Sequence, residues 1–171
     1  MTPDNPLVFT IRNIVARTLE YPFKVWGFGE GIALEAVWQA GIDLQAPEYQ
    51  QPVIALLDRW LARPLVEADH SAPGGLLLDA WESTGDPRYR ERAEALAAYM
   101  HALPRAATGA LFHRPQHPDY HDFLYVDCME VDAPFLCRLA HATGDARYFD
   151  RAAEQLLGYA ALLQDDDAHL F

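Results

Sequence analysis

The sequence predicts an all-α protein built from repeated helical hairpins. Apolar residues recur at helical spacing along most of the 171 residues, no segment alternates like a strand, and one turn sequence occurs twice. Residues 84–89 read Thr-Gly-Asp-Pro-Arg-Tyr, and residues 143–148 read Thr-Gly-Asp-Ala-Arg-Tyr. A sequence that recurs at a fixed long period is typical of stacked supersecondary units.

The first third of the chain is predicted to hold three helices, at residues 7–20, 31–40 and 48–62. In each range apolar residues lie three or four positions apart, which is the spacing of one helical face. Gly41 is expected to end the second helix, because glycine readily adopts the left-handed conformation found after a helix. The second and third helices would then form a first hairpin.

The repeated turn predicts two more hairpins, which brings the total to seven helices. Gly85 and Gly144 are expected to end one helix each, and Asp86 and Asp145 suit the N-cap of the next. Pro87 then falls at the first helical position, where its missing N–H costs nothing. The tryptophans on apolar helical faces are expected in the core: Trp38, Trp60 and Trp81.

The composition excludes several classes of function. The net charge is −12, from 25 acidic and 13 basic residues, which argues against nucleic acid or an anionic membrane as a partner. No apolar run approaches the ~20 residues of a membrane span, and the start lacks a secretory signal, so a cytoplasmic protein is expected. Cys128 and Cys137 would point to opposite sides of one helix, so both are expected to be free thiols.

Three long links separate the hairpins, at residues 21–30, 63–73 and 104–126. Loops longer than ~15 residues are often functional, and all three links are expected at one end of the helical stack. Histidines recur every four positions in the last link, but Pro115 and Pro118 interrupt any helix there, so no metal is expected. The links carry most of the chemically interesting residues: Trp26, Asp69, His70, His113, His117, Tyr120, His121, Asp122 and Asp127.

Four local patterns accompany the repeated turns. They are residues 31–34 (Gly-Ile-Ala-Leu), residues 109–113 (Gly-Ala-Leu-Phe-His), Asp69 five positions before Gly74, and Asp127 seven positions before Pro134-Phe-Leu136. Together these features resemble glycoside hydrolase families 88 and 105, the unsaturated glucuronyl and rhamnogalacturonyl hydrolases.

The resemblance implies an (α/α)6 barrel of six hairpins around an axis. Residues 1–171 would form a single incomplete α/α-toroid catalytic domain, with three hairpins and an opening helix, that is, about half of the barrel. On this interpretation the chain is an N-terminal fragment, and it is expected to be inactive on its own.

The resemblance also implies a reaction and its residues. The substrate would be an oligosaccharide with a 4,5 double bond in a terminal uronate; no cofactor is expected. Asp127 would act as general acid and base, and Asp69 would be the second catalytic carboxylate. The substrate-binding residues would be His113, Trp26, Tyr125 and Tyr120.

Some positions depart from the family's pattern. Tyr125 stands where tryptophan is frequent, and Glu130 and Asp132 add charge where apolar residues are common. These departures concern substrate preference more than the class of reaction.

Other interpretations of the same residues stay open. Asp127 and Asp69 each precede a predicted helix, so each suits an N-cap without any catalytic role. Trp26 suits a sugar platform or a core position equally well. The same fold also accommodates an epimerase, an ordinary glycosidase or a non-catalytic helical-repeat scaffold.

Overall fold

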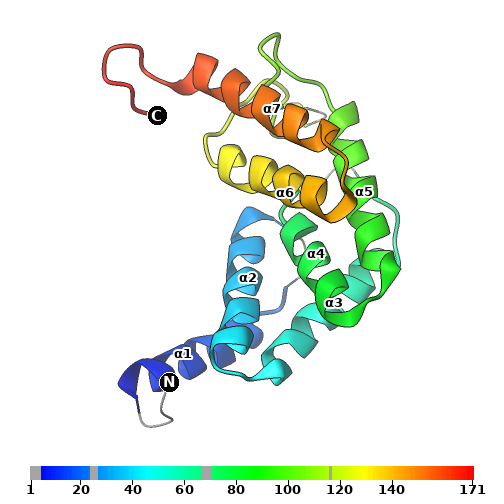
Figure 1. Ribbon diagram of the computed structural model, residues 1–171. Helices are drawn as coiled ribbons and strands as arrows, with labels where there is room; N and C mark the ends of the chain where they lie inside the picture. The colour runs from blue at the N-terminus through cyan, green and yellow to red at the C-terminus, as the bar shows by residue number, and fades with distance from the viewer. Residues whose placement is uncertain (1–4, 24–26, 67–70, 116) are drawn as a thin grey trace. The chain divides into compact units, whose positions relative to one another are not determined.

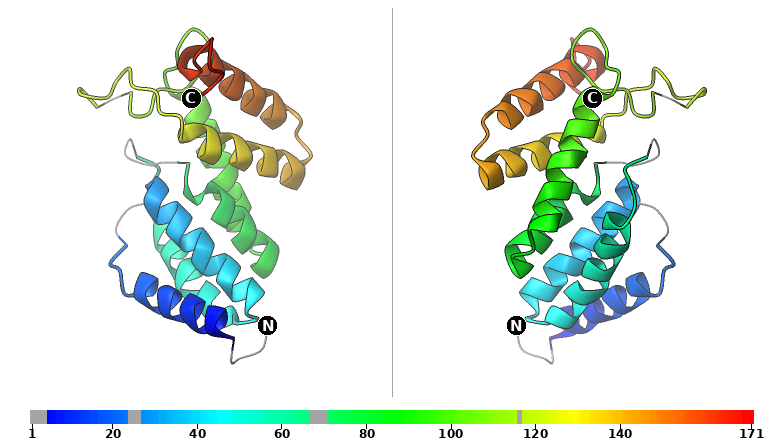
Figure 2. Two further views of the ribbon diagram at one scale, coloured as in Figure 1. Left: turned by 90° about the vertical axis from the view of Figure 1, so that its left-hand side faces the viewer. Right: turned by 90° about the vertical axis from the view of Figure 1, so that its right-hand side faces the viewer.

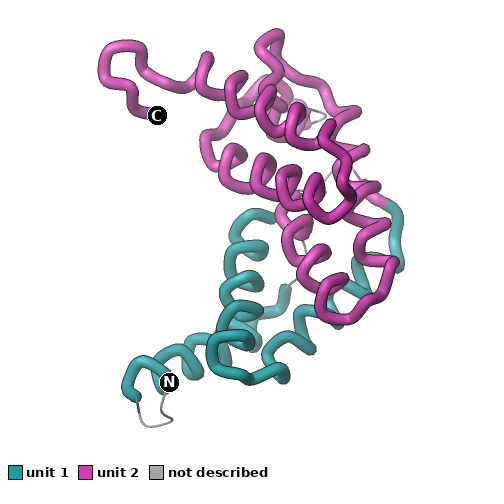
Figure 3. The backbone as a smooth tube through the Cα atoms, viewed as in Figure 1, with its two compact units in different colours: residues 1–64 teal, residues 65–171 magenta. Residues whose placement is uncertain are grey.

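The computed structural model describes residues 5–23, 27–66, 71–115 and 117–171. Within these ranges the protein is all-α, as predicted, with no strand and one isolated bridge between Arg105 and Leu111. The chain divides into two compact units, residues 1–64 and residues 65–171 (Figure 3). The helices are α1 (Pro6–Leu19), α2 (Phe28–Asp43), the short 3-10 helix η1 (Pro47–Tyr49), α3 (Gln50–Leu61), α4 (Pro73–Thr84), α5 (Pro87–Ala102), α6 (Cys128–Thr143) and α7 (Arg147–Leu163) (Figure 1).

The first unit packs α2 against both α1 and α3 (Figure 2). Asn5 caps α1, because its side-chain oxygen accepts a hydrogen bond from the Leu7 N–H at 2.9 Å. Trp38 and Trp60 are each 4% exposed, which confirms their predicted place in the core. No helix among the described residues is long and apolar enough to cross a membrane.

The predicted end of the second helix is wrong. Gly41 lies inside α2, and the residue with left-handed backbone beyond the helix is Gln45, at a φ of 55°. A Cβ at position 41 would lie 3.2 Å from the Ala46 carbonyl oxygen and 3.1 Å from the Gln50 side chain. Gly41 therefore permits a close approach of the returning chain, a role that turn patterns in a sequence do not distinguish from helix termination.

The second unit contains the repeated hairpins α4–α5 and α6–α7, which confirms the predicted internal repeat. Gly85 and Gly144 both end their helices at a φ of 72°. After each glycine, the aspartate accepts the backbone N–H of the arginine two positions later at 3.0 Å and pairs with its guanidinium at 2.6 Å. The two turns thus share one hydrogen-bonding scheme, with Asp86–Arg88 in the first and Asp145–Arg147 in the second.

Helices α4 and α6 lie side by side and run in the same direction. A Cβ on Gly74, at the start of α4, would overlap the ring of Phe135 in the middle of α6, so only glycine permits this approach. Further along, the Arg138 guanidinium pairs with the Asp79 carboxylate at 2.5 Å. Ser71, just before α4, therefore meets Asp132 in the first half of α6 at one end, and Gly85 and Gly144 lie at the other.

Three features of these helices bear on the sequence predictions. Trp81 is only half-buried, because it lies beneath the guanidinium of Arg90 at 5.3 Å rather than in the core. Pro134 is exposed within α6, and the helix continues past it. Cys128 is buried and Cys137 half-buried, and both are free thiols, as expected.

Candidate active site

Asp127 stands directly before α6 but does not cap it. Its backbone is already helical, at φ −64° and ψ −23°, and its side chain makes no capping hydrogen bond. Its Oδ1 atom is buried and has no hydrogen-bond partner among the described residues. A buried carboxylate oxygen without a donor is costly, so the feature indicates a group that awaits a ligand or a proton.

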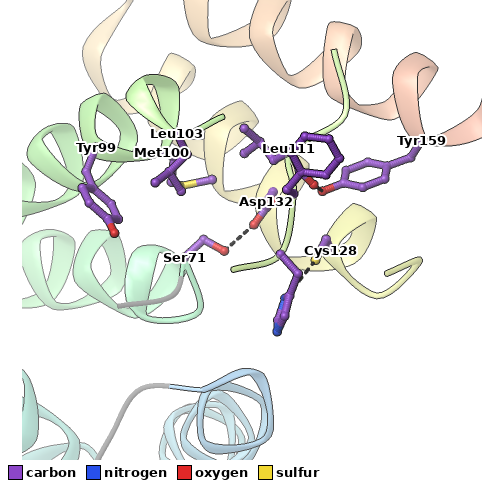
Figure 4. A pocket seen from close by; sticks show the side chains of 10 residues that line it. Ser71, Tyr99, Met100, Leu103, Leu111, Cys128, Asp132 and Tyr159 are labelled. Atoms are coloured by element: carbon purple, nitrogen blue, oxygen red, sulfur yellow. Dashed lines mark hydrogen bonds between the residues drawn. The ribbon is translucent and has the colours of Figure 1, made fainter. Parts of the chain in front are cut away.

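Asp132 is a second carboxyl group on α6, and only 6% of this residue is exposed. The Ser71 hydroxyl, just before α4, donates a hydrogen bond to its Oδ1 (Figure 4). The pKa of Asp132 is raised to about 6, mainly by burial; the Ser71 hydrogen bond lowers it, and the charge of Asp127 makes a smaller upward contribution. Asp132 therefore changes its charge close to neutral pH.

His113 lies in the segment between α5 and α6. Its backbone N–H donates to the Phe123 carbonyl at 2.9 Å, and its Nδ1 lies 3.8 Å from the Cys128 sulfur. Burial lowers the pKa of His113, and the positive charge of Arg114 lowers it further, although the carboxylate of Asp127 opposes both effects. The imidazole is thus mainly neutral at pH 7, where it can both donate and accept a hydrogen bond.

Aromatic rings form a continuous series along the same segment. The Tyr125 ring lies 4.8 Å from His113 and 6.3 Å from Phe123, and the Phe123 ring lies 5.5 Å from Tyr120. Tyr125 is 40% exposed and Phe123 46% exposed, so both present ring surface to solvent. Exposed aromatic faces suit the apolar side of a sugar ring.

Behind Asp132 lies a small cavity of about 30 Å³ (Figure 4). Burial raises the pKa of Cys128 to about 12 and raises that of Tyr159 as well, so both side chains are uncharged at neutral pH. The Tyr159 hydroxyl donates to the Leu111 carbonyl at 2.9 Å. A cavity of this size accommodates one water molecule, and its polar wall is formed by Ser71, Tyr99, His113, Cys128, Asp132 and Tyr159.

The structure brings together four of the residues singled out from the sequence: His113, Tyr120, Tyr125 and Asp127. All four belong to one segment of the second unit. Asp69 and Trp26 lie outside the described residues. Within the described ranges, no three His, Cys, Asp or Glu side chains are placed to hold a metal ion.

Sequence reasoning did not select Phe123 or Asp132 for the site. A possible indication for Phe123 was the run of aromatic residues between positions 120 and 125. The indication for Asp132 was a charge within an apolar stretch, since such residues are seldom fully buried without a reason. Its burial itself depends on the packing of α4 against α6, which the local sequence does not reveal.

Tight glycine turns at one end of the helices, with carboxyl groups and aromatic rings at the other, define a helical-repeat protein with a polar site suited to a sugar. The sequence model of Glycosyl Hydrolase Family 88 matches residues 12–171. Because the match covers nearly the whole chain, the protein belongs to this family. Its class of reaction is glycoside hydrolysis, and its substrates are carbohydrates.

Proposed function

We propose that the protein hydrolyses unsaturated uronyl oligosaccharides by hydrating the 4,5 double bond, with Asp127 as the general acid. The observation that carries this proposal is the buried Oδ1 of Asp127, which lacks a partner among the described residues. A proton donor needs such an atom, because a group saturated by hydrogen bonds from the protein has less freedom to exchange a proton with a substrate.

The reaction proceeds in three steps: protonation at C4, addition of water at C5, and opening of the hemiketal with release of the aglycone. The carboxyl proton of Asp127 passes to C4, and the double-bond electrons form the new C–H bond. Water then bonds to C5 and returns a proton to the Asp127 carboxylate. The hemiketal at C5 opens to a ketone, and the aglycone leaves C1 as the free alcohol. No carboxylate attacks C1, unlike in most glycosidases.

The exposed fraction of each residue indicates which of the two carboxyl groups, Asp127 or Asp132, contacts the substrate. Asp132 has the raised pKa that suits an acid, but at 6% exposure it does not reach a substrate. Asp127 is half-buried and stands at the helix start, where its charge acts on His113, whose ring packs against Tyr125. Asp127 is therefore the group proposed to touch the substrate.

The neighbouring residues supply binding. The faces of Tyr125 and Tyr120 are proposed to support the sugar ring, and neutral His113 to hydrogen-bond a sugar hydroxyl. Asp69 and Trp26 keep the roles that the family resemblance implies for them, as second carboxylate and as aromatic platform.

A uronate needs a local cation, because the chain's net charge of −12 repels it. Arg114 follows His113, is exposed and forms no ion pair among the described residues. We therefore assign the substrate carboxylate to Arg114. Replacing it by Gln should raise KM for the unsaturated uronide about tenfold and leave KM for the uncharged methyl ester of the same substrate unchanged. Arg59→Gln, which removes an exposed arginine of α3, is the matched control.

The experiment that tests the function compares two substrates. Protein expressed from its complete gene is incubated with an unsaturated uronyl disaccharide and with its saturated counterpart. The ultraviolet absorbance of the double bond should disappear as the first substrate is cleaved, while the second stays intact. Cleavage of the saturated substrate would indicate an ordinary glycosidase. Cleavage of neither would indicate a non-catalytic protein or different sugar chemistry.

A further inference from the structure

Cys128 is the first residue of α6, next to Asp127 in the sequence, and its side chain is buried. Its sulfur lies 3.8 Å from the Nδ1 atom of His113, a hydrogen bond to a sulfur-containing group that is drawn as a dashed line at Cys128 in Figure 4. Both residues also line the small cavity beside Asp132. The contact therefore joins the start of α6 to the segment that carries the aromatic rings.

The surroundings of Cys128 hold its sulfur in place. The residue packs in a buried cluster with Ala110 and Tyr159. The Tyr159 hydroxyl donates its proton to the Leu111 carbonyl at 2.9 Å, so this proton is not available to the sulfur or to the ring of His113. Packing on the other sides thus keeps the thiol against the histidine.

The chemistry of the two groups determines which of them donates. A thiol sulfur is a weak acceptor, whereas one nitrogen of a neutral imidazole is a good acceptor. Burial raises the pKa of Cys128 to about 12, so the sulfur keeps its proton at neutral pH. Burial also lowers the pKa of His113, so the ring is neutral there. The favourable arrangement is therefore an S–H group that donates to Nδ1, with the proton of the ring on Nε2.

Other contacts of His113 fix its position but act on different atoms. Its backbone N–H donates to the Phe123 carbonyl at 2.9 Å, which fixes the backbone. The Tyr125 ring meets the imidazole edge to face, with 4.8 Å between the ring centroids, which orients the plane of the ring. The thiol contact, in contrast, acts on one particular ring nitrogen.

We infer that Cys128 is a positioning residue for His113: its thiol donates a hydrogen bond to Nδ1, keeps the proton of the neutral ring on Nε2, and thereby makes His113 a hydrogen-bond donor to a sugar oxygen. The hydrogen bond made by one ring nitrogen of a histidine sets whether the other nitrogen carries a proton. The inference deepens the proposed function and rests on it for the contact with the sugar. The position of the ring proton does not depend on that function.

The first test locates the ring proton by NMR. Two-bond nitrogen–proton spectra of histidine-labelled protein, with His113 assigned from His113→Gln, are recorded at a pH where the ring is neutral. Wild-type His113 should carry its proton on Nε2. Cys128→Ala should shift the Nδ1 resonance and populate the second tautomer, whereas Cys128→Ser, which keeps a donor, should largely restore the wild-type spectrum.

The matched control is Cys137→Ala, because Cys137 is the other free cysteine of α6. This variant should leave the His113 resonances unchanged. A proton on Nδ1 in wild-type protein, or an Nδ1 resonance that stays the same in Cys128→Ala, would overturn the inference. The wild-type measurement alone decides the direction of the hydrogen bond, even if a variant fails to fold.

The second test compares KM and kcat on the unsaturated disaccharide. Cys128→Ala should raise KM about fivefold and leave kcat within about twofold, because the hydrogen bond from His113 acts in binding and not at C4. Cys128→Ser should recover most of the wild-type KM, and Cys137→Ala should keep both constants. A fall in kcat in place of the rise in KM would show that Cys128 acts by supporting Asp127, and would overturn its role for His113.

The two tests separate the possible failures. Absence of turnover in wild-type protein would remove the proposed function, and the NMR spectra would still decide the hydrogen bond between Cys128 and His113. Normal turnover with the ring proton on Nδ1 would remove the inference alone.

Discussion

The acidic residues at the two ends of α4 and α6 differ in how fully they are hydrogen-bonded and ion-paired. At the turn end, Asp86 and Asp145 each accept a backbone N–H and pair with an arginine, so their charges are fully partnered. At the other end, Asp127 has a buried oxygen without a donor and Asp132 has a single hydroxyl donor, among the described residues. We infer from this difference that the acidic residues of the turns stabilise the repeat, whereas carboxyl groups that lack hydrogen-bond partners indicate the functional site.

Asp127→Asn should separate activity from stability. The amide cannot protonate C4, so kcat on an unsaturated uronide should fall by about 10³-fold. The free energy of unfolding should hardly change, because the carboxylate caps no helix and accepts no hydrogen bond at Oδ1. Kinetics and thermal unfolding of the same preparation check both parts. A large loss of stability would show that Asp127 is a structural cap.

Asp132→Asn should stabilise the fold at neutral pH. The pKa of Asp132 is about 6 in the folded protein and ~3.9 in an unfolded chain, so ionisation weakens folding as pH rises from 4 to above 6. The two-unit difference corresponds to about 3 kcal/mol at pH 7 and to almost nothing below pH 4. Urea unfolding at both pH values measures it. A variant that is less stable at pH 7 would contradict the direction of this shift.

Gly74→Ala should destabilise the contact between the two hairpins. The added methyl group overlaps the Phe135 ring, and such overpacking typically costs about 2 kcal/mol. Gly29→Ala is the control, since a Cβ there meets nothing within 4 Å and a helical Gly→Ala change is favourable by up to ~1 kcal/mol. Opposite shifts of the melting temperature are therefore expected. Equal shifts would mean that α4 and α6 are not in close contact.

Gly85→Ala and Gly144→Ala should have the smallest effects, and these should match. Both glycines have a φ of 72° with open space where a Cβ would lie, so each change costs about 1 kcal/mol through backbone strain alone. Activity of each folded variant should equal that of the wild type, since the turns lie at the far end from Asp127. Unequal losses of stability would break the equivalence of the repeats.

Much of the fold was predictable because the repeated turn sequence marks where one helix ends and the next begins. Gly85 and Gly144 are each followed by an aspartate that accepts the same backbone hydrogen bond, and local backbone chemistry fixes both turns. The predicted N-cap is confirmed for Asp86 but wrong for Asp145, because α7 begins one residue later and its N-cap is Ala146. Gly41 was misinterpreted because a glycine that permits close packing looks the same in sequence as one that ends a helix. Trp81 was misplaced because periodicity does not show which charged side chain covers an apolar face.

The site was predictable only where a motif existed. Asp127 and His113 were selected through their family resemblance, and the structure places both around the start of α6. Asp132 was not selected, because the sequence shows neither its burial nor its hydrogen bond with Ser71, which lies 61 positions away. Long-range contacts of this kind leave no local pattern.

The source of the new hydrogen at C4 tests the central claim most directly. The reaction is run in heavy water, and the product is examined by NMR and mass spectrometry early in the time course. If Asp127 exchanges its proton with solvent and protonates C4, the wild-type product carries one deuterium at C4, and Asp127→Asn forms almost no product. A product without deuterium on the ring carbons, released at the wild-type rate, would show that the glycosidic bond breaks without hydration of the double bond and would contradict the mechanism.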